Sequence, residues 1–216
     1  MRKLEAVLFD MDGTLVETES LWKLSERTTM QKFGQPWTRE DEIDATGGPF
    51  ERVAQIMADR AGVQVDEINA VLDETIQDLF RNRPIELQPG VAQLIDELEQ
   101  AGIPIALVSN SYRALVDIIN SRIDVEFVLT VAGDEVEIPK PDPGPYLTAA
   151  DSLDVDIKNC IVIEDSEPGI ASAIASGAAV VAIPGHNDVP DAPRIQVIQS
   201  IEELSVGALE NLVTGN

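Results

Sequence analysis

Cysteine, histidine and basic side chains are scarce in this chain of 216 residues, which has one cysteine, one histidine and 15 lysines and arginines. Cys160 has no second cysteine for an internal disulfide, and His186 alone cannot complete a Cys/His zinc cluster. Any bound metal is therefore expected to have oxygen ligands. Long apolar runs are also missing, because every such run is far shorter than the ~20 residues of a membrane span.

The first residues, MRKLEAVLFDMDG, combine charges with an apolar run that soon ends in carboxylates. This pattern is not typical of a secretory signal or of an anchor. We therefore expect a cytoplasmic protein that has no membrane partner. Its length fits one compact domain, or one domain that carries an insertion, and we expect a monomer or a homodimer.

Acidic side chains are abundant, because 39 Asp and Glu residues against 15 Lys and Arg residues give a net charge of −24. Such a charge repels polyanions, so no nucleic acid is expected as a partner. We interpret most of the excess as a solvated surface. A small phosphate can still bind where a divalent cation and one lysine reverse the potential locally.

Short apolar runs, rich in strand-forming residues, alternate with helical segments in most of the chain, and they predict a parallel sheet covered on both faces. The expected strands are Leu4–Phe9, Ile103–Val108, Phe127–Val131, Cys160–Ile163 and Ala179–Ile183. The expected helices between them are Val91–Ala101, Tyr112–Asn120, Pro145–Leu153 and Pro168–Ser176. The pattern predicts a doubly wound α/β domain, in which ligands bind beyond the carboxyl ends of the strands.

About ninety residues separate the first expected strand from the second, which is more than a βαβ crossover requires. Apolar residues at helical spacing and capping signals predict four helices in this interval. They are Thr18–Phe33, a short helix after Thr38, Phe50–Arg60, and a longer helix that Asp66 opens and Pro84 ends. We therefore expect residues 1–15 and 87–216 to form the catalytic core and residues 16–86 to form an all-helical insert.

Two carboxylates stand at the end of the first expected strand, in Asp10-Met11-Asp12-Gly13-Thr14. Residues two apart in a strand point the same way, so Asp10 and Asp12 share one side. Such a pair can divide the work of a nucleophile and a general acid/base. An acidic pair that caps a turn is the structural alternative.

The ends of the later strands also carry polar residues. Ser109 and Asn110 follow the second strand, where a hydroxyl and backbone N–H groups can hold phosphoryl oxygens. Lys140 lies in a proline-rich loop after the third strand, and Glu164 and Asp165 follow the fourth, where hard divalent ions take carboxylate oxygens. Helix capping by Ser109 and a solvated surface lysine are the alternatives for single motifs, but the ordered set indicates one site.

DMDGT, LVSNS, KPDP and VIEDS resemble, in order and spacing, the four motifs of the haloacid dehalogenase superfamily. The resemblance covers nearly the whole chain and implies a Rossmann-like core with a helical cap inserted after the first strand. It implies that Asp10 attacks phosphorus and that Asp12 protonates the leaving oxygen and then activates water. It also implies the remaining roles: Ser109 and Asn110 hold the phosphoryl group, Lys140 neutralises charge, and Mg²⁺ is bound by Asp10, the Asp12 carbonyl and Asp165, with Glu164 beside it.

Within that superfamily the chain looks like the β-phosphoglucomutase-like branch, and the segment from Val16 to Trp22 is similar to that of its sugar-phosphate phosphatases. The mutases have histidine where this chain has Trp22, and their cap arginine aligns with Phe50, with Arg52 nearby. These departures favour hydrolysis over mutase chemistry. Trp22 and Arg52, with the loop of residues 46–52, are the expected substrate contacts in the cap, and packing within the cap is the alternative for Trp22.

The favoured hypothesis is a magnesium-dependent phosphatase that acts on a small phosphorylated metabolite, a sugar or polyol phosphate. A phosphoglucomutase with the same nucleophile is the alternative. A signalling receiver also combines aspartate, hydroxyl, lysine and magnesium, but it is much shorter and has no helical lid. Its acidic pair lies on the first strand and its phosphorylated aspartate comes later in the chain, whereas here the expected nucleophile is on the first strand. A phosphate-binding protein without turnover is disfavoured, because Asp10 and Asp12 are both present.

Overall fold

The computed structural model describes residues 3–45, 50–183, 189–190 and 192–215. Contacts divide the chain into two units, which we call the sheet unit (Met1–Glu17 and Glu86–Asn216) and the helical unit (Thr18–Ile85). The expected loop contacts at residues 46–49, and His186, lie outside the described residues. Within the described ranges, the helices are too short or too polar to cross a membrane.

The sheet unit is built on six strands in the order β3-β2-β1-β4-β5-β6, and every neighbouring pair is parallel. The strands are β1 (Ala6–Phe9), β2 (Ile105–Val108), β3 (Leu129–Val131), β4 (Cys160–Glu164), β5 (Ala179–Ala182) and β6 (Ile195–Val197). All residues of β1, β2, β4 and β5 are buried, and apart from Glu164 at the end of β4 these strands are continuous apolar runs. The expected doubly wound α/β fold is confirmed.

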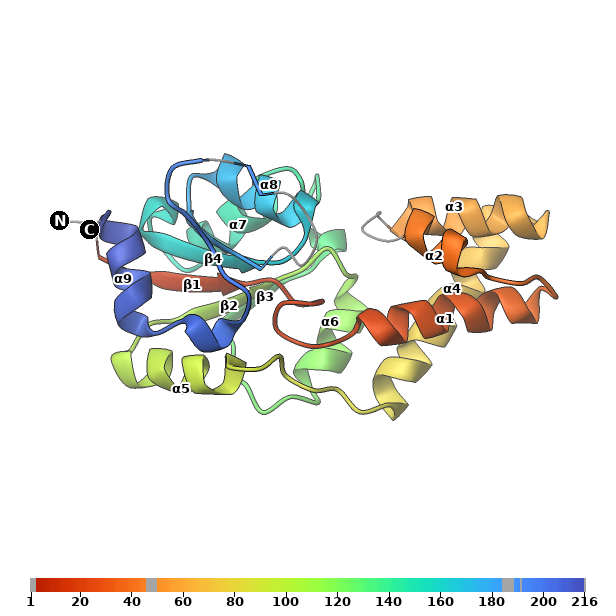
Figure 1. The fold of residues 1–216 in the computed structure, drawn as a ribbon, viewed down its shortest axis with the longest axis horizontal. Helices are drawn as coiled ribbons and strands as arrows, with labels where there is room; N and C mark the ends of the chain where they lie inside the picture. The colour runs from red at the N-terminus through yellow and green to blue at the C-terminus, as the bar shows by residue number, and fades with distance from the viewer. Residues whose placement is uncertain (1–2, 46–49, 184–188, 191, 216) are drawn as a thin grey trace. The chain divides into compact units, whose positions relative to one another are not determined.

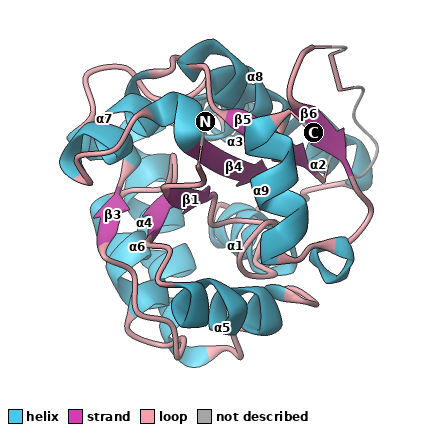
Figure 2. Ribbon diagram, turned by 90° about the vertical axis from the view of Figure 1, so that its left-hand side faces the viewer, coloured by secondary structure: helices cyan, strands magenta, loops and turns pink. Residues whose placement is uncertain are grey.

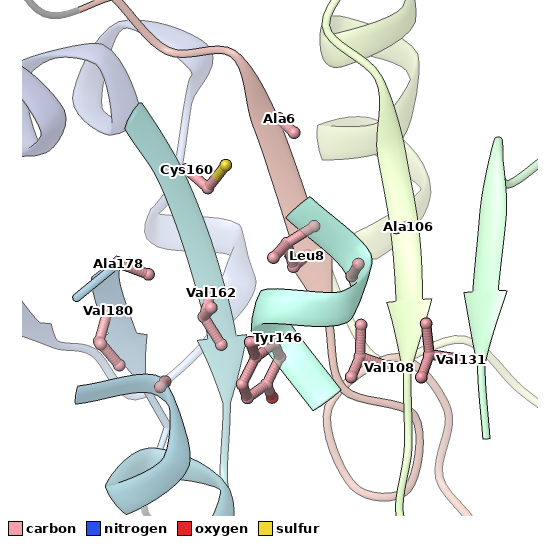
Figure 3. Close-up of a cluster of buried hydrophobic side chains, with 12 residues drawn as sticks. Ala6, Leu8, Ala106, Val108, Val131, Tyr146, Cys160, Val162, Ala178 and Val180 are labelled. Atoms are coloured by element: carbon pink, nitrogen blue, oxygen red, sulfur yellow. The ribbon is translucent and has the colours of Figure 1, made fainter. Parts of the chain in front are cut away.

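Helices cover both faces of this sheet (Figures 1 and 2), with α7 and α8 on one face and α5, α6 and α9 on the other. Their bounds are α5 (Val91–Ala101), α6 (Arg113–Asn120), α7 (Gly144–Ser152), α8 (Glu167–Ser176) and α9 (Val206–Thr214). Single 3₁₀ turns lie at Gly133–Glu135, Ile157–Asn159 and Ile201–Glu203. Figure 3 shows the buried cluster under α7, where the Tyr146 ring lies among side chains of the strands, including Leu8, Val108 and Val162.

Two C-terminal elements were not predicted from the sequence. The edge strand β6 has only three residues and is half-exposed, so it has no apolar run to reveal it. Helix α9 begins after Ser205, whose hydroxyl accepts from the Ala208 N–H, and ends at Gly215 with φ 77°. This cap pair is the ordinary start and stop signal of a helix, but no prediction was made for residues 205–216.

The helical unit contains α1 (Glu19–Lys32), α2 (Arg39–Ala45), α3 (Phe50–Ala61) and α4 (Val65–Asn82). Helices α1 and α3 both pack on α4. The first turn of α2 has the expected reciprocal cap, because the Asp41 carboxylate accepts from the Thr38 N–H and the Thr38 hydroxyl accepts from the Asp41 N–H. The unit has its own apolar core of Met30, Ala45, Val53, Ala54, Met57, Ala58, Ile68 and Leu72. The expectation of helices throughout this interval agrees with the described residues.

Candidate active site

Asp10 extends β1 by one residue at the carboxyl edge of the sheet. Its N–H donates to the Ile163 carbonyl at 3.0 Å, and its side chain is buried. The chain then turns at Gly13, whose φ is 89°. A Cβ at this glycine would lie 2.3 Å from the Asp165 carboxylate, so glycine allows the turn to approach that acid.

Lys140 lies at the centre of the site although it belongs to the loop after β3. The Asn110 side chain donates to the Lys140 carbonyl at 3.1 Å and accepts from the Lys140 N–H at 2.9 Å, which fixes the loop against the end of β2. The buried Nζ donates to Asp10 Oδ1 at 2.6 Å, Glu164 Oε1 at 2.7 Å and the Val108 carbonyl at 2.8 Å. These three acceptors match the three protons of an ammonium group.

Glu164 is completely buried at the end of β4, and both of its oxygens accept hydrogen bonds. Oε1 accepts from Lys140 Nζ and, at 2.9 Å, from the Tyr146 hydroxyl. Oε2 accepts from the N–H groups of Asp165 and Ser166 and from the Ser166 hydroxyl, each at 3.0 Å. Donors on every side hold this carboxylate in one orientation, as a buried charge requires.

The carboxylates of Asp10, Glu164 and Asp165 offer oxygens that lie within 4.8 Å of one another. Burial and the Glu164 charge raise the pKa of Asp10 well above its ordinary value, although Lys140 opposes this shift. The same two causes raise the pKa of Asp165 to about 7. For Lys140, burial lowers the pKa, but the Asp10 and Glu164 carboxylates outweigh burial and the net shift is upward. The cluster of three carboxylates therefore has more negative charge than the Lys140 ammonium can balance.

Asp12 and Ser109 lie at neighbouring strand ends. Asp12 Oδ2 accepts from the Ser111 hydroxyl at 2.8 Å. Ser109 is buried, and its hydroxyl accepts from the Ser111 N–H at 2.9 Å. Ser111 thus joins the residues after β2 to the proposed acid/base, and it orients the Asp12 carboxylate.

Trp22 and Arg52 belong to the helical unit. The Trp22 ring packs edge to face with Phe50 and Phe80, at centroid distances of 6.3 Å and 5.9 Å. These contacts give Trp22 a packing function on α1. Arg52 is exposed on α3.

Four residues whose hydroxyls donate to the site's carboxylates were not assigned a role from the sequence. They are Thr14, which donates to Asp165 Oδ1 at 2.9 Å, together with Ser111, Tyr146 and Ser166. Thr14 and Ser111 lie inside motifs that were recognised, so the sequence already placed them near the site. Tyr146 follows Lys140 by six residues on an apolar helix face, where an aromatic residue predicts only packing.

Comparison with known proteins identifies the family of this chain. The family model described as haloacid dehalogenase-like hydrolase matches residues 7–183. The chain therefore belongs to the haloacid dehalogenase-like hydrolases, in the phosphatase branch of that superfamily.

Curated relatives with phosphatase names are moderately similar. The chain is 35% identical over 195 residues to the bifunctional riboflavin kinase/FMN phosphatase of Arabidopsis thaliana, aligning over 85% of this chain but only half (50%) of that protein. It is 28% identical to a phosphorylated carbohydrates phosphatase of Thermotoga maritima, over 81% of this chain and 82% of that one.

A solved structure is similar over almost the whole chain. It is a variant of CbbY from Rhodobacter sphaeroides in complex with xylulose-(1,5)bisphosphate. The TM-score is 0.83 at 31% identity, and the alignment covers 96% of this chain and 99% of CbbY.

Proposed function

We propose that this protein is a magnesium-dependent phosphatase that hydrolyses a small sugar or polyol phosphate through an aspartyl-phosphate on Asp10. The observation that carries the proposal is the buried Lys140 ammonium, which lies 2.6 Å from Asp10 and 2.7 Å from Glu164. An anionic nucleophile can approach an anionic phosphate only where positive charge offsets their repulsion. The names of the relatives support a phosphorylated carbohydrate as substrate.

The donor set fits a divalent cation. Three clustered carboxylates face one ammonium, and carboxylate oxygens are the ligands that Mg²⁺ prefers. Because Glu164 already accepts from donors on both oxygens, Asp10, Asp165 and the Asp12 carbonyl are the proposed direct ligands, with Glu164 beside them. When bound, Mg²⁺ supplies positive charge next to the phosphoryl oxygens and lets Asp10 and Asp165 keep their negative charges.

The proposed reaction has two steps. Asp10 attacks phosphorus and forms the Asp10–phosphate bond, while the bond from phosphorus to the sugar oxygen breaks and Asp12 gives that oxygen a proton. Asp12 then takes a proton from a water molecule, which attacks phosphorus, releases inorganic phosphate and restores the Asp10 carboxylate. Ser109 and backbone N–H groups after β2 hold the phosphoryl oxygens, and Lys140 offsets their charge. Asn110 acts with them by fixing the Lys140 backbone.

A panel of phosphorylated metabolites, assayed for phosphate release with Mg²⁺ and with excess chelator, tests this function. Release from small sugar or polyol phosphates that needs Mg²⁺ would support it, and absence of release from every small monoester would reject it. The mutase alternative is tested in the same panel. A sugar monophosphate that is isomerised when a sugar bisphosphate is added, without net phosphate release, would favour the mutase.

Magnesium is expected to raise the unfolding temperature of the protein, because it relieves the repulsion among Asp10, Glu164 and Asp165. At a hundredfold excess over its dissociation constant, the gain is about 2.7 kcal/mol of unfolding free energy. Thermal unfolding with and without Mg²⁺ measures it. Asp165→Ala should lose both this shift and turnover, whereas Asp151→Ala, at an exposed acid on α7, should keep both. An unchanged Mg²⁺ shift in Asp165→Ala would remove Asp165 from the metal site.

Asp12→Asn is expected to separate substrates by their leaving groups. Sugar alkoxides need a proton as they leave, whereas aryl oxides do not, so the first step should slow for sugar phosphates and be nearly unchanged for an aryl phosphate. The water step should slow by roughly 10²–10⁴-fold, the usual effect of lost acid/base help. An aspartyl-phosphate should then accumulate and be visible by intact mass. Equal slowing of the first step for both substrate types would contradict the role of Asp12.

We propose that the helical unit selects among small phosphates, because the sheet-unit residues contact the phosphoryl group that all candidates share. Arg52→Ala should therefore change the ranking of sugar phosphates by kcat/KM and leave an aryl phosphate nearly unaffected. Arg81→Ala, at an exposed arginine on α4, is the matched control.

Trp22→Ala should change the same ranking and should also lower the unfolding temperature, because it removes the contacts with Phe50 and Phe80. A uniform loss on all substrates would remove Trp22 and Arg52 from the proposed specificity site.

A further inference from the structure

Tyr146 is the largest of the fully buried side chains in the described chain, and it makes two polar contacts at once. Its hydroxyl donates to Glu164 Oε1 at 2.9 Å, and its ring lies under the Lys140 ammonium, 4.8 Å from Nζ to the ring centroid. The ring belongs to the buried apolar cluster of the sheet unit (Figure 3). A buried hydroxyl needs a partner whatever its role, but packing alone does not require that partner to be the Glu164 oxygen that also accepts from Lys140.

Tyr146 and Lys140 donate to the same oxygen of Glu164. A carboxylate oxygen that already accepts one hydrogen bond attracts a second donor less strongly, because part of its charge is compensated. The Tyr146 hydroxyl therefore weakens the attraction of Glu164 for Lys140. Lys140 Nζ lies at nearly equal distances from the Asp10 and Glu164 carboxylates, 2.6 Å and 2.7 Å. These distances are those expected when the ammonium interacts about equally with both carboxylates.

We propose that Tyr146 is a positioning residue: by donating to Glu164 Oε1, it keeps the Lys140 ammonium shared with Asp10 and available to the phosphoryl group. Without the hydroxyl, Glu164 Oε1 depends on Lys140 alone and draws the ammonium away from Asp10. The ring also contributes, because its negative face stabilises the buried ammonium. The inference rests on the proposed function, since it assigns Lys140 to phosphate.

Tyr146→Phe tests this directly, because it keeps the ring and removes only the donor. We expect kcat for sugar phosphates to fall about tenfold, the effect of weakening one hydrogen bond to a charged group. Calorimetric titration with inorganic phosphate in the presence of Mg²⁺ should give about tenfold weaker binding at unchanged stoichiometry. The stoichiometry reports the fraction of folded protein, and the affinity reports the state of the phosphate site. Loss of fold and loss of positioning are therefore measured separately.

Ser176→Ala is the matched control, because it removes another buried hydroxyl of the sheet unit, which donates to the Ala173 carbonyl at 2.7 Å on α8. It should lower the unfolding temperature and leave phosphate affinity unchanged. If Tyr146→Phe folds poorly, 4-methylphenylalanine and 4-aminophenylalanine at position 146 give the same comparison. Both fill the volume of the hydroxyl, but only the amino group donates, so only it should restore phosphate affinity.

The outcomes separate this inference from the proposed function. If the wild-type protein hydrolyses sugar phosphates and Tyr146→Phe has the same kcat and the same phosphate affinity, the inference is overturned. The proposed phosphatase function then still stands. A loss confined to stoichiometry also overturns it, because Tyr146 is then a packing residue. A wild-type protein that binds phosphate but hydrolyses no monoester rejects the proposed function, whatever Tyr146→Phe does to phosphate affinity.

Discussion

Asp10→Asn is expected to reduce phosphate release to the uncatalysed background, a loss of at least about 10⁴-fold, because it removes a covalent nucleophile. The amide has almost the same shape as the carboxylate, and its oxygen can still accept from Lys140. In the unsubstituted protein, Lys140 Nζ lies 2.6 Å from Asp10 Oδ1. It lacks the negative charge that attacks phosphorus. Phosphate release from the best substrate of the panel measures the loss, and intact mass should show no phosphorylated protein.

The fold should survive this substitution. Burial and the charge of Glu164 raise the pKa of Asp10, so the charged carboxylate is costly in the protein without metal. A neutral amide removes that cost, and the unfolding temperature without Mg²⁺ should not fall. Residual turnover well above background in a folded Asp10→Asn protein would show that another group attacks phosphorus.

Gly169→Ala is expected to have the largest effect on stability. Gly169 lies in the first turn of α8, where a Cβ would be 1.7 Å from Glu164 Oε1. Since both atoms cannot occupy this space, Glu164 would have to leave its donors. Displacing a buried charge from its partners costs about 3–5 kcal/mol, which exceeds the ~1 kcal/mol that alanine gains over glycine in a helix. Denaturant unfolding measures the loss, and turnover should disappear with the Lys140 contact.

Gly207→Ala is the matched control for this change. Gly207 also lies in the first turn of its helix, α9, and a Cβ there would have no neighbour within 4 Å. The substitution should be neutral or stabilise the protein by up to about 1 kcal/mol. Similar losses for the two variants would mean that helix geometry, and not the Glu164 carboxylate, determines the requirement for glycine at position 169.

The sheet was predictable because its strands are buried on both faces. Four-residue runs such as Ala6–Phe9 have no polar face to disguise them. The half-exposed Ile195–Val197 has no such run, and its pairing with β5 is a tertiary effect. Local signals therefore identified the interior of the sheet but missed one of its edges.

In the candidate site, residue types at strand ends were predictable, but the contacts of each side chain were not. Lys140 was recognised as a single basic residue in a rigid loop, yet its three acceptors come from three different strands or strand ends. Asn110 was expected to hold phosphate, and its side chain binds the Lys140 backbone. Tyr146 was missed because an aromatic residue on a helix face has the same sequence pattern whether or not its hydroxyl has a partner.

The place of β1 in the strand order has a consequence for how the protein opens. This strand is hydrogen-bonded on one side to β2 and on the other to β4, and its four residues are 0% exposed. Backbone amides in such a position exchange with solvent only when the domain unfolds as a whole. Asp10, the proposed nucleophile, thus directly follows a strand whose backbone amides belong to the slowest-exchanging class. Thermal fluctuations that open edge strands or surface helices leave the backbone of Asp10 in place.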